Sequence, residues 1–258
     1  CKNFLGGVKL SHSKGFTLAE VLVALGIIGV VAAITMPVLI NNHQKAVILA
    51  QLKEAYSILT NAIELAKNDN NSGITSDWGA LAMSGKDTKS VSQDEYKNFV
   101  NNFVNKRFLP YLHVTRDFEA QNNKEMLEMY GYSGIKNPET GEVSFGRKWR
   151  RCLVLSNGML LMFFITNSAC LETDSDTGEC LRRNYGTLAV YVDVNGYKGH
   201  NAEGKDVFLM AFDPRYGDLI MHGKQKNIDN CNTPSTVQYC GYIIQKAGWN
   251  FPDNYRWW

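Results

Sequence analysis

A single carboxylate stands near the start of a long apolar segment. Glu20 is the one acidic residue between residues 16 and 40, where nearly every other side chain is apolar. A carboxylate inside a bilayer costs on the order of 2.5–3.5 kcal/mol at the centre, and less near an end, unless a positive group meets it. The first turns of a helix also suit an acid, because the helix dipole is positive there. We therefore expect Glu20 to meet a cation when the helix is embedded.

A second group of oxygen-bearing side chains lies in a glycine-rich segment far along the chain. Asp193, Asn195 and Asp206 are interspersed there with glycines. Calcium takes six to eight oxygen ligands in flexible geometry, which makes these three residues calcium candidates. The segment lacks the terminal Glu of an EF-hand, and Lys198 and Lys205 oppose a cation. A glycine-rich connection between strands explains the same residues equally well. No other cofactor is expected.

The cysteines offer disulfides rather than catalysis. Cys170 with Cys180 and Cys231 with Cys240 would each close a loop of about ten residues, and each bridge would contribute on the order of 2–3 kcal/mol. Spacing alone does not fix the connectivity. Cys152 lies in a predicted strand and is expected to be a buried free thiol. The chain has no C-x-x-C pair and its histidines are scattered, so neither a zinc site nor a Cys–His nucleophile is predicted.

The apolar segment is long enough to cross a membrane. At about 1.5 Å per residue, residues 16–40 reach roughly 37 Å, and a bilayer core is about 30 Å thick. An ordinary secretory signal has about 7–15 apolar residues and then a small-residue cleavage site. This run is longer and continues into a further helix. A simple membrane anchor, the other alternative, would not need a carboxylate at its fifth position.

The residues GFTLAEVLVALGIIGVVAAITMPVLI, Gly15 to Ile40, resemble the N-terminal segment of the type IV pilin and pseudopilin family. The resemblance covers roughly the first quarter of the chain. It implies that a membrane peptidase cuts between Gly15 and Phe16, and that Phe16 is then N-methylated. It implies that Glu20 meets the N-terminal amine of a neighbouring subunit, so that assembly neutralises both charges. Pro37 matches a family proline at which the helix can loosen in the filament.

Residues 1–15 read as a leader peptide in this interpretation. They carry three lysines and no acid, which keeps them on the cytoplasmic side by the positive-inside rule. We therefore expect a single-pass inner-membrane protein whose globular domain, residues 71–258, lies in the periplasm. Disulfides persist in such a compartment. The chain starts at Cys1, and a truncated start is a simpler explanation than a lipid-modified cysteine.

Beyond Pro37 the helix becomes amphipathic over residues 41–70. Apolar residues recur at three-to-four spacing, which predicts one buried face; they are Ile48, Leu52, Ala55, Leu59, Ala62, Ile63 and Ala66. Turn-forming residues at 68–73 end the helix. Pro37 itself predicts a kink or local melting, because proline removes one backbone donor and crowds the preceding turn.

The sequence of the globular domain, residues 71–258, predicts an α+β fold. In this fold the long N-terminal helix packs on a small antiparallel sheet, as in pilin-like domains. Residues 94–113 show helical spacing up to Pro110, and residues 122–130 suit a short helix. From residue 149 onward, apolar runs separated by Asn-Gly and other turn residues predict three to five antiparallel strands. The aromatic residues 249–258 are expected to be irregular and docked on the body.

The resemblance implies a structural subunit, a pseudopilin or minor pilin of a type II secretion or type IV pilus system, and not an enzyme. Its partners would be pilin-like subunits, the prepilin peptidase/methylase and an inner-membrane assembly platform driven by a cytoplasmic ATPase. The chain has 27 basic and 25 acidic residues, so no broad nucleic-acid surface is expected. One alternative is a membrane-anchored pilus-tip subunit for adhesion or DNA uptake. An exported hydrolase is another, but no nucleophile–base motif supports it.

Overall fold

The computed structural model describes residues 15–69, 91–143, 149–166, 169–173, 180–184, 187–213, 218–223 and 226–258. The chain separates into two compact units, residues 1–44 and residues 45–258. One long helix, α1 (Leu18–Asp69), begins in the first unit and ends in the second. All of the predicted leader, residues 1–15, except Gly15 lies outside the described residues, and so do residues 70–90.

Helix α1 is continuous through Pro37. The predicted local melting at this proline is therefore absent from the single subunit. In this segment the neighbouring turns of the helix supply enough hydrogen bonds to carry the helix past one missing donor.

Within the second unit, α1 packs on a sheet by the predicted apolar stripe. The seven stripe residues are all buried, at 5% exposure or less: Ile48, Leu52, Ala55, Leu59, Ala62, Ile63 and Ala66. Lys67, near the end of the helix, bonds Glu64 and the edge-strand residue Asp218, each at 2.9 Å. The amphipathic pattern therefore predicted the packed face of this helix residue by residue.

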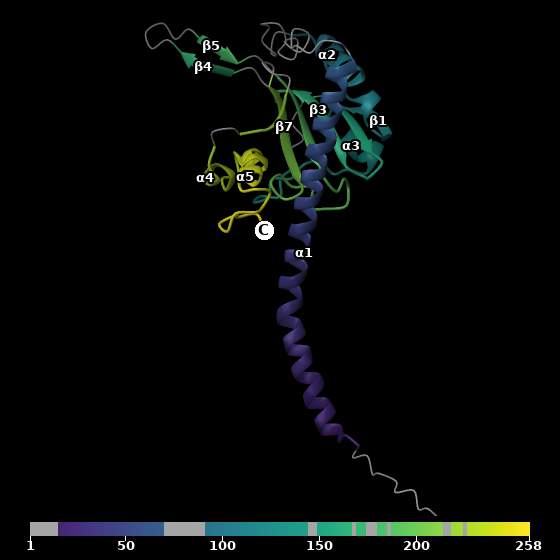
Figure 1. Ribbon diagram of the computed structural model, residues 1–258, viewed down its shortest axis with the longest axis vertical. Helices are drawn as coiled ribbons and strands as arrows, with labels where there is room; N and C mark the ends of the chain where they lie inside the picture. Colours follow the sequence, from purple (N-terminus) through teal and green to yellow (C-terminus); the bar gives the residue numbers. More distant parts are fainter. Residues whose placement is uncertain are drawn as a thin grey trace, which may run out of the picture. The chain divides into compact units, whose positions relative to one another are not determined.

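The main sheet of the described chain has six antiparallel strands in the order β1-β2-β3-β6-β7-β8. Figure 1 labels β1, β3 and β7 of this sheet. Their bounds are Val114–Ala120, Arg150–Leu155, Leu160–Ile165, Leu188–Asp193, Val207–Asp213 and Asp218–Met221. A separate two-stranded sheet pairs β4 (Ala169–Thr173) with β5 (Cys180–Asn184). The expected hairpins at Asn157-Gly158 and between β7 and β8 are confirmed by the strand pairing.

Short helices cover both faces of the sheet. Their bounds are α2 Gln93–Arg107, η2 Leu109–Tyr111, α3 Asn123–Tyr130, α4 Ile228–Cys231, η3 Val237–Tyr239 and α5 Cys240–Lys246. The core on one face joins α1, α2 and α5 to the inward side chains of the sheet, among them Phe108, Phe163 and Phe212. A second core, which includes Met126 and Tyr132, lies on the other face. Strands β2 and β3 are consequently buried on both sides.

The fold class is the predicted α+β arrangement, but the strand count was too low. Strand β1 was missed because it is an edge strand with four exposed residues among its seven. Its sequence, Val-Thr-Arg-Asp-Phe-Glu-Ala, lacks the apolar alternation that marks a half-buried strand. The register also shifts between Val114 and Arg116. Strands β4 and β5 were missed because polar and turn-forming residues dominate that stretch.

The cysteines confirm two of the predictions. Cys231 and Cys240 form a disulfide, and Cys152 is a buried free thiol. Burial raises the pKa of Cys152 to about 12, so its thiol is inert at neutral pH. Cys170 and Cys180 lie opposite Arg183 and Thr173 in the β4–β5 register. Their side chains fall outside the described ones, and their pairing stays a prediction.

Candidate functional site

The start of α1 is closed by a reciprocal capping box. The backbone N–H and the hydroxyl of Thr17 both donate to the Glu20 carboxylate at 2.8 Å. In return the Glu20 N–H donates to the Thr17 hydroxyl at 3.2 Å. Threonine followed three residues later by glutamate, ahead of an apolar run, is the usual signature of this motif. The sequence carried that signature, and our interpretation of Glu20 overlooked it.

The capping box gives Glu20 a role inside its own subunit. Its carboxylate accepts the Thr17 N–H, a backbone donor that has no partner within the helix. These bonds hold the carboxylate at the N-terminal end of α1, next to Phe16. Phe16 is 88% exposed. A carboxylate fixed in one rotamer loses less conformational entropy when a cation binds it than a freely rotating one would. The capping box therefore pre-organises the Glu20 carboxylate for binding a cation.

Within the described part of the first unit, the surface between Phe16 and Ile40 is apolar and exposed. Every large apolar side chain from Phe16 to Ile40 is at least 43% exposed. The mean hydropathy of the helix reaches 2.6 over its most apolar stretch, and by length and composition this helix is able to cross a membrane. Gly26 and Gly29 leave open space where a side chain would stand. An exposed apolar surface of this extent requires lipid or other protein around it.

In the second unit, Asp193 and Asp206 are brought together in the connection between β6 and β7. Asp193 ends β6 and is fully buried. Its carboxylate accepts the Tyr132 hydroxyl at 2.8 Å and the Asn195 N–H at 3.3 Å. Burial, and next the charge of Asp206, raise the pKa of Asp193 well above its usual range.

Asp206 folds the loop around its own carboxylate. It is 1% exposed and accepts the backbone N–H groups of Asn201, at 3.0 Å, and Ala202, at 2.7 Å. The Asn195 amide donates to the same carboxylate at 3.3 Å. Gly199 passes so close that a Cβ there would lie 2.2 Å from Asp206 Oδ2. The glycine is thus required by a close approach of backbone to carboxylate.

Two buried amide oxygens in the same loop have no hydrogen-bond partner within the described part of the chain. They are Oδ1 of Asn195 and Oδ1 of Asn201. Within the described ranges, Asp193 and Asp206 form no ion pair and no three His, Cys, Asp or Glu side chains cluster as a metal site. Two acidic and two unsatisfied neutral oxygens in one buried loop are unusual, because unpaired buried polar groups are costly. Carboxylate and amide oxygens are the kinds of ligand that a calcium ion takes, so one ion could coordinate all four residues.

Comparison with known sequences divides the chain into two matched regions. Residues 10–36 match the prokaryotic N-terminal methylation motif. Residues 38–257 match DUF6613, described as a family of unknown function. The chain belongs to the DUF6613 family. The first match confirms the predicted pilin-like N-terminal segment in this DUF6613 member, and it contains Gly15, Phe16 and Glu20.

This DUF6613 chain is also similar to curated proteins of type II secretion systems. The chain is 35% identical over 89 residues to the type II secretion system core protein G of Aeromonas hydrophila, 34% of this chain and 60% of the relative. It is 38% identical over 82 residues to the protein of the same name from Vibrio cholerae, 31% of this chain and 54% of the relative. The chain thus spans little more than half of these relatives. No solved structure matches.

Proposed function

We propose that this chain is a pseudopilin-like structural subunit that polymerises through α1 in a type II secretion or related pilus machine, and that it performs no catalysis. The observation that carries the proposal is the capping-box carboxylate of Glu20 at the head of an exposed apolar helix, directly behind Gly15-Phe16. Similarity to the type II secretion core protein G of two species supports the choice of machine.

The physical mechanism is charge neutralisation in an apolar medium. Cleavage after Gly15 would create an amine on Phe16, and N-methylation would leave it able to carry a proton. When a neighbouring subunit brings this amine to Glu20, both charges lose the cost of standing alone in hydrocarbon. The membrane first holds the helix, and sister subunits then replace lipid around it. The peptidase/methylase and an inner-membrane platform are the partners this route requires, with the body in the periplasm.

Processing can be tested by intact mass. The mature protein, purified from membranes, is expected to begin at Phe16 and to carry one added methyl group. A Gly15→Leu variant should retain its leader, because the peptidase needs a small residue before the cut. Leu5→Ala, a change elsewhere in the leader, serves as the control and should be cleaved normally. An unmodified product, or one starting at any other residue, would contradict the proposed processing.

We also propose that the β6–β7 loop binds calcium through Asp193, Asn195, Asn201 and Asp206. The fit rests on the two buried carboxylates and the two orphaned amide oxygens. The ion would neutralise the repulsion between the two acids and satisfy both amide oxygens. Its role would be structural, because it would fix a loop that connects two central strands.

Thermal unfolding with calcium and with chelator tests this site. At a calcium concentration about 100 times the Kd, binding adds about 2.7 kcal/mol, which corresponds to a rise in Tm of roughly 5–10 °C for a domain of this size. Asp193→Asn should abolish most of the calcium-dependent rise. Glu203→Gln changes an acid in the same loop that bonds Tyr191 instead and should keep it. An equal Tm with calcium and with chelator would rule the site out.

A further inference from the structure

The position of helix α4 depends on the Cys231–Cys240 disulfide. It has four residues, Ile228–Cys231, and helices this short are not stable by themselves in water. The disulfide ties its last residue, Cys231, to Cys240, the first residue of α5. A capping box between Asn227 and Asn230 closes its other end. The disulfide therefore fixes where the end of α4 lies.

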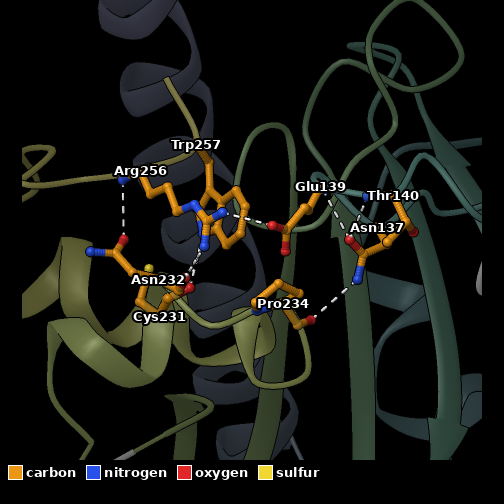
Figure 2. Close-up of polar contacts among 8 residues, drawn as sticks. All are labelled: Asn137, Glu139, Thr140, Cys231, Asn232, Pro234, Arg256 and Trp257. Carbon is orange, nitrogen blue, oxygen red and sulfur yellow. Dashed lines mark hydrogen bonds and ion pairs between the residues drawn. The ribbon is translucent and has the colours of Figure 1, made fainter.

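The segment Pro252–Trp258, called the clasp here, binds this fixed end of α4 (Figure 2). The Trp257 indole N–H donates to the Cys231 carbonyl at 2.9 Å. Asn232 accepts the Arg256 N–H on its side-chain oxygen at 3.0 Å and donates its amide to the Asn254 carbonyl at 2.8 Å. The clasp is irregular and docked, as the sequence predicted, and its docking point is the disulfide-bonded turn.

The clasp also contacts the β6–β7 loop that contains Asp193 and Asp206, called the acidic loop here. The Tyr255 hydroxyl, which is buried, donates to the Gly204 carbonyl. Gly204 has a φ of +76°, and a Cβ there would lie 2.9 Å from Val237 and 3.0 Å from Trp257. Gly204 is two residues from Asp206. The backbone at Gly204, next to Asp206 in the loop, therefore packs closely against the clasp.

Residues 136–139 form a further link between the clasp and the acidic loop. Figure 2 shows Arg256 reaching Glu139, with 2.7 Å between Nη2 and Oε1, and Asn137 donating to the Pro234 carbonyl at 3.2 Å. The neighbouring Lys136 pairs with the acidic loop: its N–H donates to the Asn201 carbonyl at 2.7 Å. The clasp thus reaches the loop directly through Tyr255 and indirectly through residues 136–139.

We propose that the clasp is a redox-dependent lock on the Asp193–Asp206 loop, which closes when Cys231 and Cys240 are oxidised. Disulfide formation joins the two sulfurs and passes two protons and two electrons to an oxidant, here a disulfide-bearing thiol oxidase. In the reduced chain, α4 loses its anchor, the clasp loses its docking point, and Gly204 is released. The proposal holds whatever the loop binds, and it does not depend on assembly.

Hydrogen exchange of the full chain in detergent micelles tests the lock. Tyr255→Phe leaves the Gly204 carbonyl without its partner inside the protein, and this should speed exchange of the amides at 199–206 about tenfold. The double variant Cys231→Ala/Cys240→Ala should have at least the same effect. Exchange in β2 and β3 should stay unchanged in both variants, because among the described residues no hydrogen bond joins these strands to the clasp.

Two matched controls separate the lock from general loosening. Tyr242→Phe removes a hydroxyl on α5 that makes no hydrogen bond to the described part of the chain, and it should leave the loop protected. Cys170→Ala/Cys180→Ala should do the same. Wild-type exchange at 199–206 in Tyr255→Phe would overturn the proposal. So would an increase in that variant equal to the increase in β2 and β3, because it would report global destabilisation.

Discussion

The full chain carrying Glu20→Gln is expected to insert into the membrane at the wild-type level but to enter sheared fibres at least tenfold less. Glutamine still accepts the Thr17 N–H, so the capping box and the helix start survive. What the variant loses is the negative charge that would neutralise a neighbour's amine. A tenfold effect corresponds to about 1.4 kcal/mol per contact, below the cost of one unpaired charge in a membrane helix.

The comparison variants separate charge from capping. Glu20→Ala removes both and should assemble no better than Glu20→Gln. Thr17→Val removes the hydroxyl from the capping box but keeps the acid, so it should assemble at a level nearer to wild type. The amounts of each variant in membranes and in fibres are read by immunoblot. Wild-type quantities of Glu20→Gln in fibres would show that the charge has no part in assembly.

Phe108→Ala is expected to lower the free energy of unfolding of the body by about 3–5 kcal/mol. The ring is fully buried, and its centroid lies 5.0 Å from that of Phe163 and 5.4 Å from that of Phe212. It follows α2 directly and fills the space between that helix and strands β3 and β7. Its removal leaves a cavity that closely packed neighbours cannot fill.

Urea unfolding of the chain in micelles, followed by tryptophan fluorescence, measures this loss. Leu127→Ala is the control: this residue is 54% exposed on α3, and its truncation should change the free energy by less than about 0.5 kcal/mol. Equal midpoints for Phe108→Ala and wild type would mean that the aromatic core does not hold the α2 end on the sheet.

Carboxylates occur in two contrasting settings in this chain. The Glu20 carboxylate accepts donors at an exposed helix start and remains open to a partner. Asp193 and Asp206 are buried: Asp193 accepts the Tyr132 hydroxyl, and Asp206 accepts backbone N–H groups of its own loop. An enclosed pair of acids suits a small cation, whereas an accessible acid in an apolar surface suits the terminus of another chain. Burial, and not residue type, makes the distinction.

Local patterns determined much of this protein because they depend on neighbours in the sequence. The apolar run, the stripe from Ile48 to Ala66 and the Asn157-Gly158 hairpin each follow from spacing within a short stretch. Spacing also made Cys231 and Cys240 candidates for the disulfide that the structure shows. The capping box at Thr17 was equally readable from the sequence. Strand β1 was not, because an exposed edge strand is specified by its partner β2 rather than by its own pattern.

Only the tertiary structure decided the long-range contacts. The sequence placed Asp193 near Asp206, but it did not show that Tyr132 bonds one carboxylate or that Tyr255 bonds Gly204. It also did not show that the clasp docks on Cys231. Such contacts join residues far apart in the chain. They form only when the sheet and its helices have brought several segments together, so no local spacing encodes them.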